Sequence, residues 1–105
     1  MRSSAQFLLS AVTVILALAL HVRAQTFTAF SGSACDGDEG STVPCNGACG
    51  DFRNRHSFHV LGAPANVLLF EGTGCTEEGF NFGTEQPGAC INVNTGTNVQ
   101  SFICG

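Results

Sequence analysis

The apolar residues of this chain are grouped in short runs, separated by stretches rich in Gly, Asp, Ser and Thr. Four of these runs have the β-branched and aromatic composition of strands: TFTAF, SFHVL, NVLLF and VQSFI. The residues between the runs are those that accept tight or left-handed turns. Beyond residue 24, no segment has a sustained apolar period of 3.6 residues, the period of an amphipathic helix. The pattern predicts a small all-β sandwich or barrel.

The two halves of this pattern repeat each other. Residues 26–35 align with residues 66–75, and the short sequences GAC and SF then recur in the same order. A fixed internal period is a strong indication of fold. We therefore expect a single cysteine-rich β domain over 25–105, with an internal repeat of 26–61 and 66–104 and one Greek key in each copy. The identical positions of the first alignment are Phe30 and Phe70, Gly32 and Gly72, and Cys35 and Cys75.

One spacing in the repeat resembles a known motif. An aromatic residue followed after six residues by a glycine, as in Phe30 and Gly37, is similar to the folded hairpin of the βγ-crystallin motif. The segment SFHVLGAPANVLLFEG at 57–72 resembles the junction between two such motifs. The resemblance implies a small disulfide-stabilised sandwich of two Greek-key motifs. The second copy departs from the motif, because Glu77 stands where the glycine is expected.

The resemblance also implies roles for individual residues. Ser57 and Ser101 are expected to be structural, with hydroxyls that hydrogen-bond across to the folded hairpins. One Greek key cannot cover its own apolar face, so the two copies are expected to cover each other. The four phenylalanines expected in the shared core are Phe30, Phe58, Phe70 and Phe102.

The first 24 residues are predicted to be a secretory signal peptide. Arg2 supplies a positive charge, an apolar run follows at 7–20, and VRA at 22–24 fits a cleavage site. The apolar run is shorter than the roughly 20 residues that a membrane-spanning helix needs. We expect cleavage after Ala24, an extracellular location and no membrane anchor.

The cysteines follow the predicted signal peptide. An even number of cysteines in a short secreted chain predicts a disulfide framework, which compensates for a small apolar core. A tetrahedral zinc site is disfavoured, because Cys45 and Cys49 lack a second close pair of ligands. Sequence alone does not choose the connectivity. The internal symmetry favours Cys35–Cys49, Cys75–Cys90 and Cys45–Cys104, with no free thiol among the six cysteines Cys35, Cys45, Cys49, Cys75, Cys90 and Cys104.

Charge and composition narrow the partners. Beyond residue 24 the chain has two arginines, no lysine and eight acidic residues, which argues against nucleic acid and against anionic membranes. Trp and Tyr are absent, so nothing supports a sugar site. The windows at 52–57 and 96–101, where many crystallin-like motifs bind calcium, lack paired oxygen ligands. The acidic residues Asp36, Asp38 and Glu39 are expected to form a solvated turn. We expect no metal and no cofactor.

We expect no catalytic residues. His56 and His59 are three positions apart, so on a strand they point to opposite faces, and nothing supplies Ser57 with a base and an acid. The segment DFRNRHSF at 51–58 instead places both arginines among aromatic residues, a composition favoured at binding hot spots. The alternative is that the arginines only keep an acidic surface soluble. The candidate partner-binding residues are Phe52, Arg53, Arg55 and His56.

A predicted signal peptide, six cysteines and a short acidic body together resemble the small cysteine-rich secreted proteins of filamentous fungi. The resemblance implies a non-enzymatic, effector-like or interaction protein, which acts outside the cell on a host or a competitor through an unknown protein partner. Two alternatives stay open. An inhibitor of a secreted hydrolase would use the Gly-rich segment 36–48 or 83–89 as its rigid loop, and a toxin would act against rival cells.

Overall fold

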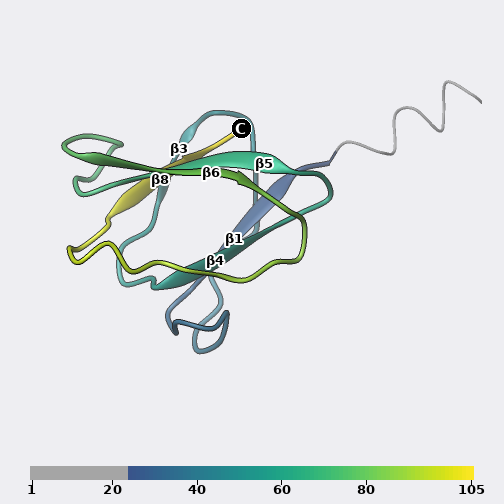
Figure 1. The fold of residues 1–105 in the computed structure, drawn as a ribbon, viewed down its shortest axis with the longest axis horizontal. Coiled ribbons are helices and arrows are strands. Elements are labelled where there is room, and N and C mark those ends of the chain that lie inside the picture. The colour runs from purple at the N-terminus through teal and green to yellow at the C-terminus, as the bar shows by residue number, and fades with distance from the viewer. Residues whose placement is uncertain (1–23) are drawn as a thin grey trace, which may run out of the picture.

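The computed structural model of the protein describes residues 24–105, so the predicted signal peptide lies outside the described residues except for Ala24. This part of the chain forms eight β-strands and no helix, as Figure 1 shows. None of it can therefore cross a membrane as a helix. The strands are β1 (Thr26–Phe30), β2 (Val43–Pro44), β3 (Cys49–Asp51), β4 (Ser57–Leu61), β5 (Ala65–Phe70), β6 (Gly79–Glu85), β7 (Ile91–Asn92) and β8 (Ser101–Cys104).

The eight strands form two antiparallel sheets that face each other (Figure 1). The strand order is β2-β1-β4-β7 in one sheet, which we call the β1 sheet, and β3-β8-β5-β6 in the other, which we call the β5 sheet. All pairings are antiparallel. The expected all-β fold is confirmed, because short strands and turn-rich segments alternate throughout the described residues.

The two halves of the chain exchange their third strands. The first half contributes β1, β2 and β4 to the β1 sheet, but its third strand β3 joins the β5 sheet beside β8. The second half contributes β5, β6 and β8 to the β5 sheet, and its third strand β7 joins the β1 sheet beside β4. Each sheet therefore contains strands from both halves, so neither half can unfold without opening both sheets.

A left-handed turn follows the first strand of each half. Cys35 and Cys75 have φ angles of 55° and 59°, and two residues later Gly37 and Glu77 have φ angles of 73° and 65°. Gly37 is required there, because a Cβ atom would lie 2.4 Å from the Ser31 hydroxyl oxygen. Glu77 departs from the motif in sequence, but its backbone takes the same left-handed conformation as that of Gly37.

The hydroxyl of one buried serine closes each of these turns. The Cys35 amide donates to Ser57 Oγ at 2.9 Å, and the Ser57 hydroxyl donates to the Gly32 carbonyl at 2.6 Å. The Cys75 amide donates to Ser101 Oγ at 2.8 Å, and that hydroxyl donates in turn to the carbonyl of Gly72. The structural role expected for both serines is confirmed.

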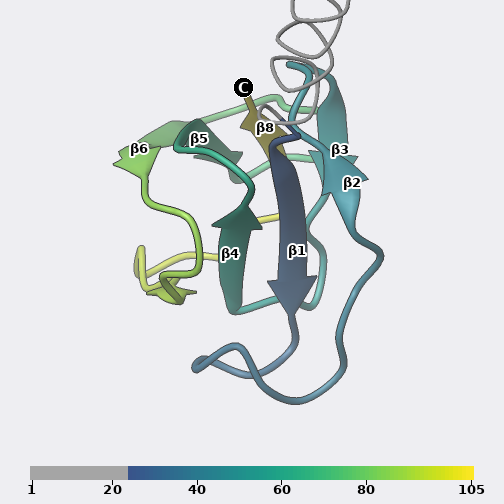
Figure 2. The same ribbon diagram turned by 90° about the vertical axis from the view of Figure 1, so that its right-hand side faces the viewer.

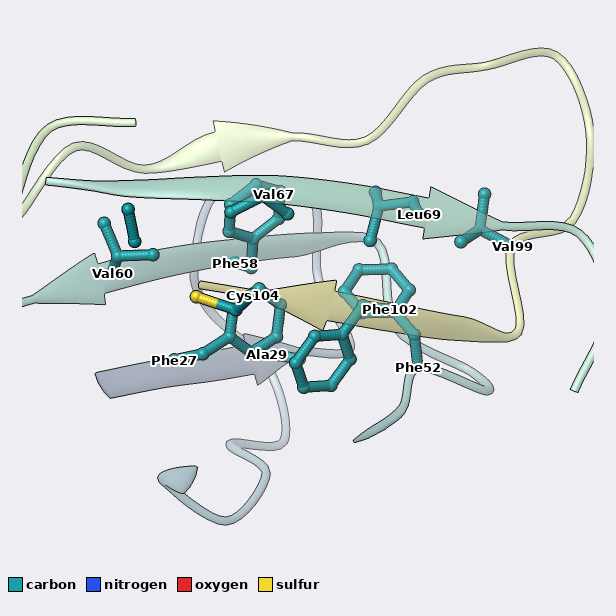
Figure 3. Close-up of a cluster of buried hydrophobic side chains, with 11 residues drawn as sticks. Phe27, Ala29, Phe52, Phe58, Val60, Val67, Leu69, Val99, Phe102 and Cys104 are labelled. Atoms are coloured by element: carbon teal, nitrogen blue, oxygen red, sulfur yellow. The ribbon is translucent and has the colours of Figure 1, made fainter. Parts of the chain in front are cut away.

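The core lies between the two sheets and is rich in phenylalanine (Figure 3). Phe27 of β1 stacks on Phe102 of β8 with 3.8 Å between ring centroids, so it joins the two sheets directly. Phe58, on β4 beside β1, also stacks on Phe27, and it is completely buried. The expectation of core positions is confirmed for Phe58 and Phe102.

The two other phenylalanines expected in the core lie outside its central cluster, and of these two only Phe30 is buried. Side chains alternate along β1, so Phe27 and Ala29 face the core while Phe30 faces away from it. Phe30 is buried, but it packs against His59 rather than in the central cluster. Phe70 is only half-buried, so its assignment to the core is wrong.

All six cysteines are paired in disulfides, and none is free. The expected bridge between Cys45 and Cys104 is confirmed, whereas the other two expected bridges, Cys35–Cys49 and Cys75–Cys90, are wrong. The three bridges are Cys35–Cys90, Cys45–Cys104 and Cys49–Cys75.

The strand exchange explains this error. Cys49 lies on β3 and Cys90 directly precedes β7, so each is carried to the sheet of the other half. Each then meets the left-handed turn of the other half, at Cys75 and at Cys35 respectively. The two bridges are equivalent in the internal repeat, but they run between the halves instead of within them.

A candidate binding cleft at one edge of the sandwich

An open cleft lies where one edge of the β1 sheet faces one edge of the β5 sheet. Its volume is about 440 Å³, within the range of ~300–1,000 Å³ that ligand-binding clefts occupy. The edge strands β2 and β3 both line it, and they lie at the same side of the molecule, next to β1 (Figure 2). The apolar part of its lining comes from Phe27, Ala29, Val43, Pro44, Ala48 and Phe102.

The cleft exists because residues on this edge are small. β1 pairs with β2 in the same register as β5 with β6, so the pair Phe27 and Val43 corresponds to the pair Val67 and Gly83. In this register, Gly40 of the first half occupies the position that Phe80 occupies in the second half. The half-buried Phe80 packs against the core, whereas Gly40 leaves space at the cleft.

A second glycine lines the cleft from the opposite sheet. Gly50 of β3 is paired with Phe102, as Ile91 of β7 is paired with Phe58 on the other edge. A Cβ atom at Gly50 would lie 2.3 Å from the Phe102 ring, so glycine is required at this position. The buried Phe102 ring thus lies against the Gly50 backbone, where the other edge carries the side chain of Ile91.

Arg53 is held at the cleft by an acidic neighbour. Its Nε and Nη2 atoms donate to the two carboxylate oxygens of Asp51 at 3.0 and 3.1 Å. These hydrogen bonds hold the pKa of the Asp51 carboxyl below its usual range, and they raise the pKa of Arg53. Both side chains are 60% exposed, so the pair contributes little to stability. It does neutralise the charge of Arg53.

Arg55 is placed differently. It is half-buried, and its Nη1 donates to the backbone carbonyl of Asp38 at 2.8 Å. The guanidinium group lies over Gly40, with Nη2 3.2 Å from the point that a Cβ atom there would occupy. Within residues 24–105, Arg55 forms no ion pair. Arg55 is therefore held at the cleft without a carboxylate of these residues in direct contact, and its charge contributes to the lowered pKa of Asp51.

The structure divides the four candidate partner-binding residues into two groups. Arg53 and Arg55 both line the cleft. His56 is exposed but does not line it, and its Nδ1 is hydrogen-bonded to the carbonyl of Ser31 at 2.7 Å. Phe52 is completely buried in the core and contacts Phe27 edge to face, so its assignment to a binding surface is wrong. An aromatic residue beside arginines in sequence is here a core residue on an otherwise exposed segment.

The nucleophilic and acidic side chains considered in the sequence have structural partners. Ser57 uses its hydroxyl both as donor and as acceptor in the turn, and His59 packs on Phe30. The Asp36 carboxylate accepts the amide of Ala34, while Asp51 binds Arg53. Within the described residues, no three His, Cys, Asp or Glu side chains are grouped as a metal site would require.

Sequence analysis missed the small residues that form the cleft. Ala29, Gly40 and Gly50 carry no functional group, so a search for chemistry passes over them. The signal was present in the internal repeat, because the repeat that aligns Phe30 with Phe70 also sets Gly40 against the bulky Phe80. Comparison of the chain with protein-family models, curated protein sequences and solved structures gave no match.

Proposed function

We propose that the chain is a secreted, non-enzymatic binding protein that contacts an extracellular protein partner through the cleft. The single observation that carries this proposal is the cleft itself, which gathers apolar surface and both arginines of residues 24–105 in one place. Arginine beside buried apolar surface is a combination that is enriched at interaction hot spots. Three disulfides are typical of proteins in an oxidising environment, which supports the extracellular location.

We also propose that the fold is a βγ-crystallin-like pair of Greek-key motifs. The exchange of β3 and β7 between the sheets supports it, as do the matched serine-closed turns. Fold does not determine function, so the cleft rather than the fold carries the functional argument. With its size and cysteine content, the protein fits the small secreted proteins of filamentous fungi that act on a host or a competitor.

The proposal is tested by capture of partners from the extracellular fluid of a host or competitor. The bait is the tagged, oxidised mature protein, and its variant Arg53→Gln/Arg55→Gln removes both charges from the cleft. A matched control, Thr84→Gln/Asn92→Gln, changes two exposed residues on the opposite edge. We expect a partner that the wild type and the control retain and the arginine variant loses. Equal capture by all three proteins would contradict the role of the cleft.

An inhibitor of a secreted hydrolase is a second proposal. The Gly-rich segment 36–48 contributes Gly40, Ser41 and Val43 to the cleft, and Cys45 anchors it to Cys104 at the end of the chain's last strand. A segment held in this way is pre-organised for insertion into an active site, which lowers the entropic cost of binding. The same capture experiment would favour this function if the partner were a hydrolase that the protein inhibits.

A further inference from the structure

The two arginines of the cleft differ in what they offer to a ligand. A guanidinium group has five N–H donors, in a planar fork that matches a carboxylate. Arg53 already uses this fork on Asp51. The guanidinium group of Arg55 donates one hydrogen bond within the described residues, to a neutral backbone carbonyl, and its remaining N–H donors form none there. Arg55 is therefore the residue that can hold an anion.

Charge and apolar surface meet at one point of the cleft. The ideal Cβ position of Gly40 lies 3.1 Å from the carbonyl oxygen of Ala29 and 3.2 Å from Nη2 of Arg55. Ala29 belongs to the apolar lining, next to Phe27 and Val43. A ligand group placed beside Gly40 would therefore meet the Arg55 cation, with the apolar residues of the cleft lining next to it.

The walls of the cleft favour an extended peptide over a compact small molecule. β2 and β3 are the outermost strands of their sheets, and an outermost strand has unpaired backbone N–H and C=O groups along its free side. Partner proteins recognise such edges by adding an extended segment in β conformation. An acidic segment is also complementary in charge, because both positive charges of residues 24–105 line this cleft of an otherwise acidic chain.

We infer that the cleft binds an extended segment of the partner in which an acidic side chain lies next to an apolar one. The carboxylate binds Arg55, and the apolar side chain packs on the apolar lining of the cleft, which includes Val43, Pro44 and Ala48. This inference rests on the proposed function and specifies the chemistry of the partner.

The test uses two peptides that differ only in charge: acetyl-Ala-Val-Phe-Glu-Ala-amide and its counterpart with Gln in place of Glu. Each is titrated into the oxidised mature protein while amide signals are followed by NMR. We expect the Glu peptide to shift the signals of Gly40, Ser41 and Gly50 and to bind about ten- to a hundredfold more tightly than the Gln peptide, the range for a hydrogen-bonded charge pair.

Matched variants separate the two arginines. Arg55→Gln should remove the preference for the Glu peptide. Asp51→Asn/Arg53→Gln removes the neutral pair without a change in net charge, and it should leave the affinity within about threefold, since the charge of Arg55 remains. Ala48→Leu keeps Arg55 but adds volume on the cleft lining, so it should weaken binding of both peptides. It also serves as the second test if Arg55→Gln fails to fold.

Four outcomes would overturn the inference: equal binding of the two peptides, no saturable shift of the cleft amides at millimolar peptide, an unchanged preference in Arg55→Gln, or full binding by Ala48→Leu. A free acid, 3-phenylpropionate, is included as a further probe. If this acid bound more tightly than the Glu peptide, the proposal that a protein segment occupies the cleft would be wrong. If the partner is still captured through the arginines when the peptides fail, only this inference fails and the proposed function stands.

Discussion

The sandwich has two sides at which the edge strands of the two sheets face each other, and these sides have the same strand arrangement but different side chains. On one side, β6 is seven residues long and places Phe80 and Phe82 against the core, with the Phe82 ring 5.9 Å from that of Phe58. On the other side, β2 has two residues, and Gly40 stands in the place of Phe80. The first side is closed and the second is the cleft. A duplicated chain can thus keep one copy for stability and leave the edge of the other copy free for binding.

What the halves share shows which features the fold itself requires. Both have a left-handed turn at a cysteine, a buried serine that closes this turn, and a disulfide that ties the turn to the exchanged strand of the other half. The halves differ in the length of the edge strands β2 and β6, in the side chains between the edges, and in the Cys45–Cys104 bridge, which has no counterpart in the repeat. The following predictions alter the shared features first and the differing ones afterwards.

The largest effect is expected from the two equivalent disulfides. Loss of either bridge, as Cys35→Ser/Cys90→Ser or Cys49→Ser/Cys75→Ser, should lower the free energy of unfolding by about 3–4 kcal/mol. The first bridge spans 55 residues and the second 26, so loop entropy makes the first loss larger by about 0.7 kcal/mol. Urea unfolding under non-reducing conditions measures both values. A larger cost for the shorter bridge would show that strand anchoring, rather than loop length, dominates.

Stability should be sensitive to truncation of a side chain on the closed edge at β6, whereas a larger side chain on the cleft lining should be tolerated. Phe82→Ala removes a ring packed on Phe58, and it should cost about 2–4 kcal/mol through lost burial and a new cavity. Ala48→Leu adds volume at an exposed residue of the cleft lining, so it should change stability by less than about 1 kcal/mol. Thermal or urea unfolding of the two variants provides the comparison. A strong loss for Ala48→Leu would mean that the cleft has no room for the added side chain.

The two serines should behave alike despite their different edges. Ser57→Ala and Ser101→Ala each leave a turn amide and a carbonyl without their partner, at a cost of about 1–3 kcal/mol. Because the hydrogen bonds are matched, the two costs should agree to within about 1 kcal/mol. Unfolding measurements on both variants test this equality. A cost for only one serine would indicate that the halves are not equivalent at their turns.

Much of the fold could be predicted from the sequence, because local rules govern it. Strand-like runs and turn residues predicted the all-β class, and the resemblance to the βγ-crystallin motif implied the hydrogen bonds of Ser57 and Ser101. The pairing of Cys35 with Cys90 could not be obtained in this way. It depends on which sheet β3 and β7 join, and that choice is made by tertiary packing rather than by any residue near the cysteines.

The candidate site was predictable only in part. Arg53 and Arg55 were identified because they are the two arginines beyond residue 24 of a chain that has no lysine. Phe52 was assigned to the binding surface because aromatic residues beside arginines are favoured at hot spots, although its own side chain points into the core. The cleft could not be predicted from functional groups, since much of its lining consists of small and apolar residues such as Gly40 and Ala48.

The smallest effect is a difference between two carboxyl groups, one at each edge. Asp51, on β3 beside the cleft, has its pKa lowered mainly by the side-chain hydrogen bond with Arg53. Glu85, at the end of β6 on the closed edge, has its pKa raised by burial. Carbon-13 NMR titration of the side-chain carboxyls should therefore find Asp51 below and Glu85 above the usual values of about 3.9 and 4.3.

The two shifts affect stability with opposite signs. The contribution of Asp51 is complete above the unfolded pKa and is lost as the pH falls through the lower folded value. The folded state instead gains stability from Glu85 as the pH falls from its raised pKa toward the unfolded value, because the buried carboxyl is then neutral. Asp51→Asn should thus weaken acid destabilisation below about pH 4. Glu85→Gln should remove the small increase in stability that develops as the pH falls toward about 4.3. If Asp51 titrated at the usual value in the wild type, Arg53 would not be paired with it. Arg53 would then be as available to an acidic ligand as Arg55, and the distinction between the two arginines would fail.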